Sequence, residues 1–326
     1  MTLKNKKENL LIYTAAIGIL LGMVALIIFE EENYFNSRLS IQSSFEVYAL
    51  AAIILAPLLE ETTFRGLFSK NKYLRVVSIL AQLIVLIMIF NQNAIGLIIG
   101  GISLIYGIWA IVKKPNTSTL RGLYFLNAFF FASLHYTLED LQHISTASPI
   151  LFQFSFGLIF IWLVINYSLS KSILAHFSLN LIFLFFGFLS LQIVDKQTHL
   201  QTFEKGQISW SQNPLYPKTN SSISFNDSSI TINNMSVLKV LEILKQEDQK
   251  ELEVFTAPFV KYNIQVAFSE DLKQEEAYLE TIRALEKAQI IKLKKPLVKH
   301  QLCHSSFPCS ISRIGIGESQ GVKRGI

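Results

Sequence analysis

The chain has 326 residues, of which 51% are hydrophobic and only 16% are charged, and its mean hydropathy is +0.38. This composition is typical of integral membrane proteins and excludes a wholly soluble fold. The net charge of +5 does not indicate a nucleic-acid partner, because lysines beside membrane helices account for it and no basic stripe with interleaved aromatic residues is present.

Apolar blocks follow one another to about residue 194, and polar residues dominate after that point. We expect a transmembrane domain over residues 1–195, a Ser- and Asn-rich linker over 196–235 and a small α+β domain over 236–326. The predicted fold is therefore an all-α polytopic membrane helix bundle, with about seven transmembrane helices, followed by this tail. The candidate spans are residues 10–29, 47–68, 76–90, 95–112, 123–138, 150–169 and 173–194.

The second span contains charged residues. Its apolar part, residues 47–59, would cover about 20 Å as a helix, whereas the bilayer core is about 30 Å thick. The helix must therefore continue to about Phe68 and carry Glu60, Glu61 and Arg65 into the membrane. Ionisable side chains cost about 2.5 to 3.5 kcal/mol there, so they usually face a protein interior or a wet cavity and serve a function.

The short loops differ in basic residues, which predicts the orientation. Lysine and arginine are concentrated in alternate loops on the side of the N-terminus, so we expect a cytoplasmic N-terminus, with the tail outside after seven spans, in the plasma membrane. The basic residues on that side are Lys4, Lys6, Lys7, Lys70, Lys72, Arg75, Lys113, Lys114, Arg121 and Lys171, against Arg38 on the other.

The tail contains apolar residues in both helical and strand periodicity. Residues 237–244 and 279–285 have helical spacing, and residues 260–268 alternate as a half-buried strand. With short strands near 228–232, 252–256 and 290–293, the order is β-α-β-β-α-β. This order is compatible with a ferredoxin-like unit.

Polar residues recur at helical spacing in three spans. Glu61 and Arg65 are four residues apart and can pair on one face, while Glu60 points about 100° away without an evident partner in its helix. Pro57 frees a carbonyl just before the pair. The other two sets are Phe131 with His135, and His176 with Asn180, again four residues apart.

This set of residues is suited to hydrolysis in a dry site. A carboxylate and a histidine can deprotonate water, and imidazole or amide groups can donate to an oxyanion. Glu60, His135 and His176 are also the composition of a catalytic zinc site with an open fourth position. A single buried histidine is more often structural, but two histidines with defined companions favour a functional site.

The three patterns, Glu60-Glu61-Thr-Thr-Phe-Arg65, Phe131-Ala-Ser-Leu-His135 and His176-Phe-Ser-Leu-Asn180, resemble the EExxxR, FxxxH and HxxxN motifs of the CPBP family of intramembrane proteases, which includes the type II CAAX prenyl endopeptidases. The resemblance covers about residues 47–189. It implies that Glu60 activates water with help from His135, that His176 and Asn180 stabilise the oxyanion, and that Glu61, Arg65 and Phe131 support the site. It leaves open whether zinc is bound or no metal is used.

Two features depart from the family pattern. An apolar hairpin, residues 76–112, is inserted between the first two motifs. In straight helices His135 would lie about 21 Å from the cytoplasmic side and His176 only about 8 Å from Lys171, although the two should meet.

The expected function is therefore an intramembrane endopeptidase that cleaves a membrane-proximal peptide bond, with membrane lipid and a peptide or membrane protein as partners. The alternative is a non-catalytic membrane binding or self-protection (immunity-type) module of the same fold. A proton or ion carrier is a third hypothesis, based only on the buried Glu and His residues.

Overall fold

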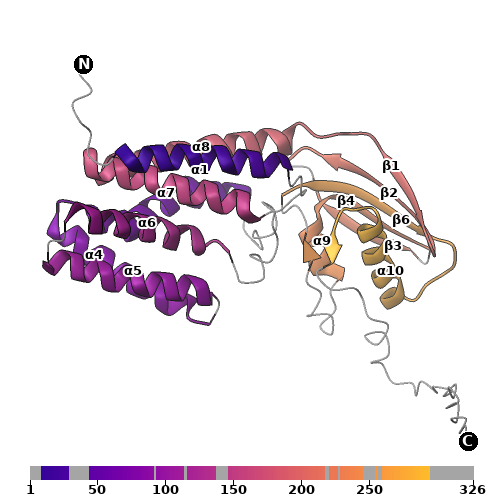
Figure 1. Ribbon diagram of the computed structural model, residues 1–326. Helices are drawn as coiled ribbons and strands as arrows, with labels where there is room; N and C mark the ends of the chain where they lie inside the picture. The colour runs from indigo at the N-terminus through magenta and orange to yellow at the C-terminus, as the bar shows by residue number, and fades with distance from the viewer. Residues whose placement is uncertain are drawn as a thin grey trace, which may run out of the picture.

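A computed structural model describes residues 9–28, 44–91, 93–113, 116–136, 146–216, 220–226, 228–244, 254–255 and 259–293. The described chain forms a helical domain and a separate domain built on an antiparallel sheet (Figure 1). Within these residues six helices are long and apolar enough to cross a membrane. This finding confirms the membrane-helix character of the first domain.

The six helices closely follow six of the expected spans. They are α1 (Asn9–Ile28), the composite helix Phe45–Phe68, α4 (Lys72–Ile89), α5 (Ala94–Lys113), α7 (Ala147–Asn166) and α8 (Leu169–Gln192).

The remaining helix, α6 (Thr117–Ser133), has 17 residues and lies between α5 and α7 in the bundle (Figure 1). It begins earlier than the expected span 123–138, because the Asn116 side chain caps it by accepting a hydrogen bond from the Thr119 N–H. It also ends earlier, so that His135 lies in the turn after the helix and not within it.

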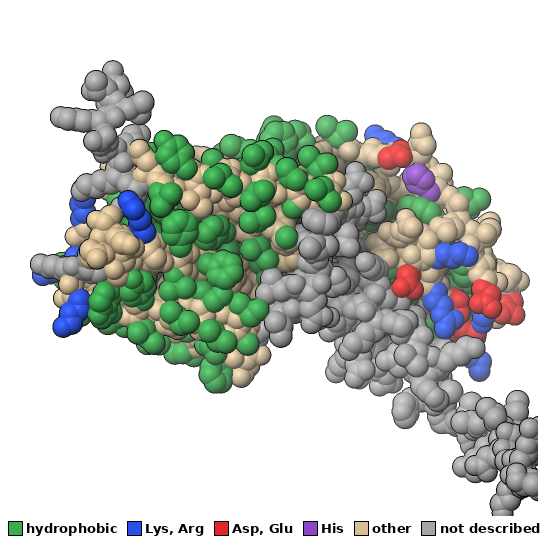
Figure 2. Space-filling view, in the orientation of Figure 1, with side chains coloured by type: hydrophobic (Ala, Val, Ile, Leu, Met, Phe, Trp, Pro, Cys, Tyr) green, Lys and Arg blue, Asp and Glu red, His purple; other side chains and the backbone are tan. Residues whose placement is uncertain are grey.

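Close packing and an apolar exterior define the bundle. α1 lies against α7, where Gly18 and Gly22 face Ser155 and Phe152; a Cβ on Gly18 would lie 2.2 Å from Ser155 Oγ. Outward-facing side chains are largely aliphatic and aromatic, and Figure 2 shows hydrophobic side chains spread over the helical domain. Such a surface suits contact with lipid chains.

The composite helix is interrupted by π-helical turns. It consists of α2 (Phe45–Leu50), η2 (Ala51–Leu55), α3 (Ala56–Glu60), η3 (Glu61–Arg65) and the 3₁₀ turn η4 (Gly66–Phe68). The turns η2 and η3 are π-helical and flank the short α3 on both sides. π-Helical turns within α-helices are frequent at functional sites.

The second domain has a five-stranded antiparallel sheet in the order β1-β2-β6-β4-β3. Ile208, Ile230 and Ile264 point from the central strands into a core shared with the two helices. The strands are β1 (His199–Phe203), β2 (Gly206–Asn213), β3 (Ser222–Asn226), β4 (Ser229–Ser236) and β6 (Lys261–Phe268), with helices α9 (Val237–Leu244) and α10 (Gln274–Lys287). A separate two-stranded sheet pairs β5 (Val254–Phe255) with β7 (Lys292–Leu293).

Two expectations for the tail need correction. The segment 196–235 is not a linker, because it contains β1, β2, β3 and most of β4. Its Ser and Asn residues alternate with buried Ile208, Ile230 and Ile232, so that the polar residues occupy the other face of the sheet. The ferredoxin-like arrangement is not confirmed, because β2 and β3 flank the central pair β6 and β4, the positions that β5 and β7 would take in that fold.

The two domains meet at the end of α8. The Gln192 side-chain amide donates to the Tyr216 carbonyl (2.6 Å), and the Tyr216 N–H donates to Gln192 Oε1 (3.1 Å). The Tyr216 hydroxyl donates to the Glu46 carboxylate at the start of the composite helix. The sheet domain is therefore attached to the bundle end opposite the first residues of α8.

Candidate active site in the composite helix

The π-helical turns around Glu60 and Glu61 release backbone carbonyls. In η2 the Ala56 N–H donates to the Ala51 carbonyl, five residues back. In the same register the next carbonyl, that of Ala52, would pair with residue 57, which is a proline and has no N–H. The Asn180 side chain in α8 donates to this carbonyl instead, at 2.8 Å. Asn180 therefore binds the distorted segment just before the site.

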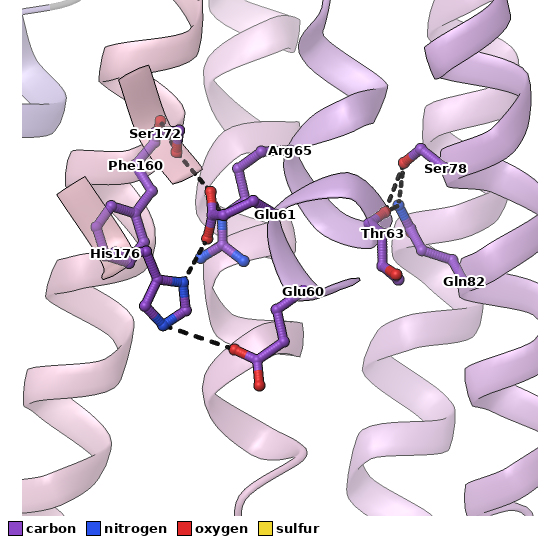
Figure 3. A network of polar contacts seen from close by, with 9 residues as sticks. All are labelled: Glu60, Glu61, Thr63, Arg65, Ser78, Gln82, Phe160, Ser172 and His176. Carbon is purple, nitrogen blue, oxygen red and sulfur yellow. Dashed lines mark hydrogen bonds and ion pairs between the residues drawn. The ribbon is translucent and has the colours of Figure 1, made fainter. Parts of the chain in front are cut away.

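The second π-helical turn releases a carbonyl in the same manner. In η3 the Gly66 N–H donates to the Glu61 carbonyl, five residues back. The Thr63 carbonyl accepts hydrogen bonds from Ser78 Oγ (2.5 Å) and Gln82 Nε2 (2.9 Å), both in α4 (Figure 3). Side chains from α8 and α4 thus hold the helix on both sides of Glu60.

Glu61 is the centre of a buried polar network, shown in Figure 3. Its Oε1 is 3.0 Å from His176 Nδ1, and its Oε2 accepts a hydrogen bond from Ser172 Oγ at 2.5 Å. Ser172 Oγ also lies 3.1 Å from the Phe160 carbonyl oxygen. Because a carboxylate accepts, His176 Nδ1 carries a proton, and Nε2 points away from Glu61.

Arg65 is completely buried and pairs with the same carboxylate. Its Nε is 3.7 Å from Glu61 Oε2, and its guanidinium lies 4.1 Å from the centre of the Phe131 ring. Among the described residues the guanidinium nitrogens have no hydrogen-bond partner. The ion pair and the cation–π contact are thus its main compensation for burial. The predicted pairing of Glu61 with Arg65 is present, and Phe131 contacts the guanidinium of the same pair.

Glu60 is the accessible carboxylate of the pair. Its side chain is 30% exposed, whereas that of Glu61 is 0% exposed, and its Oε2 lies 3.8 Å from His176 Nε2. This distance is too long for a hydrogen bond, but both atoms can bond to one water molecule placed beside them. His176 stacks on Phe160, with ring centres 4.7 Å apart, which fixes the imidazole plane. The arrangement can hold a water molecule between a carboxylate and an oriented imidazole.

His135 contacts Phe131, which in turn contacts His176 and Arg65. Its Nδ1 lies 3.1 Å from the Phe131 carbonyl oxygen, which can only accept, so Nδ1 donates. The Phe131 ring contacts both imidazoles, with centre distances of 5.2 Å to His135 and 6.4 Å to His176. The Phe131 ring therefore contacts both histidines, one from the turn after α6 and one from α8.

Two of the three expected zinc ligands lie at a suitable separation. The 3.8 Å between Glu60 Oε2 and His176 Nε2 is close to the roughly 3.4 Å between two ligands of a tetrahedral zinc ion. In the part of the chain that the structure describes, no three His, Cys, Asp or Glu side chains gather around one point. His176 Nδ1 is already oriented by Glu61, as histidine ligands usually are by a second partner.

Several residues of this site were missed in the sequence. Ser172 lies four residues before His176 on the same helix face, a spacing that gives a weak signal. Ser78 and Gln82 are also four residues apart, in an otherwise apolar helix, and would have been detectable by the same criterion. Phe160 had no detectable signal, because its contact with His176 depends on how α7 and α8 pack.

Comparisons with known proteins give no independent assignment. No protein-family model matches the chain, and neither the curated proteins nor the solved structures contain a match.

Proposed function

We propose that this protein is an intramembrane endopeptidase that cleaves a membrane-proximal peptide bond. The observation that carries the proposal is the arrangement Glu61–His176–Glu60. The buried carboxylate holds Nδ1 of the imidazole at 3.0 Å, and the accessible carboxylate faces Nε2 at 3.8 Å. A carboxylate and an oriented imidazole converging on one position are the groups required to activate water.

In the proposed reaction Glu60 removes a proton from a water molecule beside His176, and the hydroxide attacks the substrate carbonyl. Glu60 then transfers that proton to the leaving amine. In its protonated state His176 donates Nε2–H to the oxyanion, and Glu61 stabilises the imidazolium. Asn180 uses one amide proton on the Ala52 carbonyl and has a second for the oxyanion. His135, whose Nδ1 donates to the Phe131 carbonyl, assists Glu60 in this reaction.

The proposed topology has seven crossings, with α6 as the seventh, a cytoplasmic N-terminus and the sheet domain outside, in the plasma membrane. Figure 2 supports it: Lys and Arg side chains gather at the end of the helical domain that is remote from the sheet. Basic ends are normally cytoplasmic. Membrane lipid would surround the bundle, and a peptide or membrane protein would be the substrate.

Glu60→Gln tests the proposal. We expect the variant to insert and fold normally but to abolish cleavage, because the amide cannot accept a proton from water. The matched control is Glu46→Gln, which changes another glutamate of the same composite helix, one that accepts a hydrogen bond from Tyr216. Membrane and secreted peptides from cells carrying each variant would be compared by mass spectrometry. Normal cleavage by Glu60→Gln would overturn the proposal.

The metal requirement is tested on the purified protein. If zinc is bound through Glu60 and His176, exhaustive chelation abolishes cleavage and adding zinc restores it. A metal-free mechanism predicts full activity after chelation, with no stoichiometric metal by elemental analysis.

The second candidate is a non-catalytic membrane binding or self-protection module. It is favoured by the number of site residues that bind one another, since Glu61 contacts Arg65, Ser172 and His176. Such a module would keep its binding or protective effect in Glu60→Gln, because the contact of Glu60 with that network is the 3.8 Å approach to His176, which is too long for a hydrogen bond. Loss of the cellular effect together with cleavage would favour the protease.

A further inference from the structure

The α4–α5 hairpin presents polar side chains to both halves of the candidate site. This hairpin is the insertion that separates the first two motifs in the sequence. In α4 the fully buried residues are Ser78 and Gln82, with Leu86 nearly so, one turn apart along one stripe. Between α4 and α5 lies Asn93, which is 7% exposed. Polar side chains buried in a membrane domain need polar partners, and Ser78, Gln82 and Asn93 each donate to backbone carbonyls near the site.

The first contact holds the helix that carries the carboxylates. Thr63 lies in η3, between Glu61 and Arg65, and its carbonyl accepts from Ser78 and Gln82. An unpaired carbonyl inside a membrane bundle is costly, so the two donors from α4 stabilise the π-helical turn. α4 therefore helps to maintain the backbone that places Glu61 and Arg65 on their partners.

The second contact holds the turn that carries His135. The carbonyls at the end of α6 have no partner within the helix, as at every helix end. Asn93 Nδ2 donates to the carbonyls of Ser133 and Tyr136, each at 2.8 Å. These two residues flank His135 in the chain, so one amide binds the backbone on both sides of the imidazole.

The same side chain also anchors itself in α5. Asn93 Oδ1 accepts from the Gly96 N–H at 2.7 Å, and the Asn93 carbonyl accepts from the Leu97 N–H. Close packing further fixes the hairpin, because a Cβ on Gly100 would lie 2.3 Å from the Phe130 ring of α6. Asn93 thus joins a rigidly packed helix start to the turn after α6.

We propose that the α4–α5 hairpin is a positioning element for the site, and that Asn93 is the positioning residue that holds His135. The inference rests on the proposed function for its catalytic meaning. Its structural content is independent of that function, since it concerns the orientation of one imidazole. Gln82 and Ser78 perform the corresponding task for the turn beside Glu61.

Asn93→Asp separates the two tasks of this side chain. Aspartate retains the acceptor for the Gly96 N–H, and thus the cap of α5, but it has no donor for the Ser133 and Tyr136 carbonyls. Asn71→Asp and Asn116→Asp are matched controls, because these asparagines accept from Tyr73 and Thr119 N–H groups at 2.9 Å and cap α4 and α6. Asn93→Ser is a second, uncharged variant that also keeps a capping oxygen.

The direct readout is acylation of His135 by diethyl pyrocarbonate in the full-length protein in lipid nanodiscs, followed by peptide mass spectrometry. His199, which is 46% exposed, is the internal reference. We expect the His135 rate, relative to His199, to rise about tenfold in Asn93→Asp and Asn93→Ser, as for the loss of two hydrogen bonds, and to stay unchanged in both controls. Wild-type rates in either Asn93 variant that folds, or failure of both to fold, would overturn the proposal.

Activity is measured in parallel and separates the two ideas. If the protein cleaves peptides, the Asn93 variants should lower kcat with little change in KM, because His135 acts in the chemical step. A rise in His135 labelling in a protein without any proteolytic activity would contradict the protease and still support the positioning role. Unchanged labelling of His135 in an active protease would support the protease and contradict the positioning role.

Discussion

The Asn180 side chain donates to the Ala52 carbonyl at 2.8 Å, and this contact compensates for Pro57. In the π-helical register of η2, established by the Ala56 to Ala51 hydrogen bond, Pro57 is the residue that should donate to Ala52. The third motif thus contacts the helix of the first motif at its backbone, in addition to the contacts of His176 with Glu60 and Glu61. Asn180 has a structural task in addition to its proposed role at the oxyanion.

A double-mutant cycle tests this compensation. Asn180→Ala should lower the free energy of unfolding by about 1 to 3 kcal/mol, because the Ala52 carbonyl loses its donor. In a Pro57→Ala background the backbone N–H at position 57 can supply that donor, so the cost of Asn180→Ala should fall by at least half. Unfolding in mixed micelles measures all four proteins. Equal costs in both backgrounds would show that Pro57 and Asn180 act independently.

The two adjacent glutamates should differ sharply in their contribution to stability. Glu61→Gln leaves the buried Arg65 without its nearest counter-charge, which should cost about 3 to 5 kcal/mol. Glu60→Gln removes a partly exposed carboxylate whose oxygen lies 3.8 Å from His176 Nε2, too far for a hydrogen bond, and should cost less than about 1 kcal/mol. Thermal unfolding of the two variants at one pH provides the comparison. A larger loss for Glu60→Gln would contradict the assignment of the paired role to Glu61.

Ser172→Ala tests the hydroxyl that orients Glu61. The substitution removes the 2.5 Å hydrogen bond to Oε2, so we expect a loss of about 1 to 3 kcal/mol in stability and a reduced rate of cleavage. Ser178→Ala is the control in the same helix, because that exposed hydroxyl bonds only to the Leu174 carbonyl in its own helix. The control should stay within about 0.5 kcal/mol of wild type. Similar unfolding curves for the two variants would rule out a role for Ser172 in the network.

Local spacing was sufficient to predict the contacts within one helix. The four-residue separation of Glu61 and Arg65 predicted their ion pair, and the apolar blocks predicted seven spans, six of which correspond to helices of membrane length. The contact of His176 with Glu61 could not be predicted, because it depends on how α8 packs against the composite helix. From the sequence, His176 was expected to bind the oxyanion, and Arg65 was the only partner expected for Glu61.

The sheet domain shows a second reason for failure. Ser- and Asn-rich composition indicated a linker over 196–235, yet the segment forms two hairpins at the edges of the sheet. Alternation at Ile230 and Ile232 predicted the strand near 228–232, and the same alternation of Ile208 and Trp210 with polar residues was the signal that was missed. The average composition of a segment does not show whether its apolar residues alternate with polar ones, which is the pattern that marks a half-buried strand.

Gly100 and its neighbour Gly101 test the close packing of the α4–α5 hairpin. A Cβ at Gly100 would lie 2.3 Å from Phe130 and 2.6 Å from Leu86, and both partners are buried, so Gly100→Ala should cost about 1 to 3 kcal/mol. Gly101→Ala is the matched control, because nothing lies within 4 Å of its Cβ position; alanine also favours the helix, so this variant should be neutral or slightly more stable. Unfolding in mixed micelles measures the difference.

Because α5 carries the hydrogen bond to Asn93, Gly100→Ala should also raise the labelling of His135 while Gly101→Ala leaves it unchanged. Equal behaviour of the two alanine variants would show that α5 does not press against α6 as closely as the Gly100 to Phe130 contact requires.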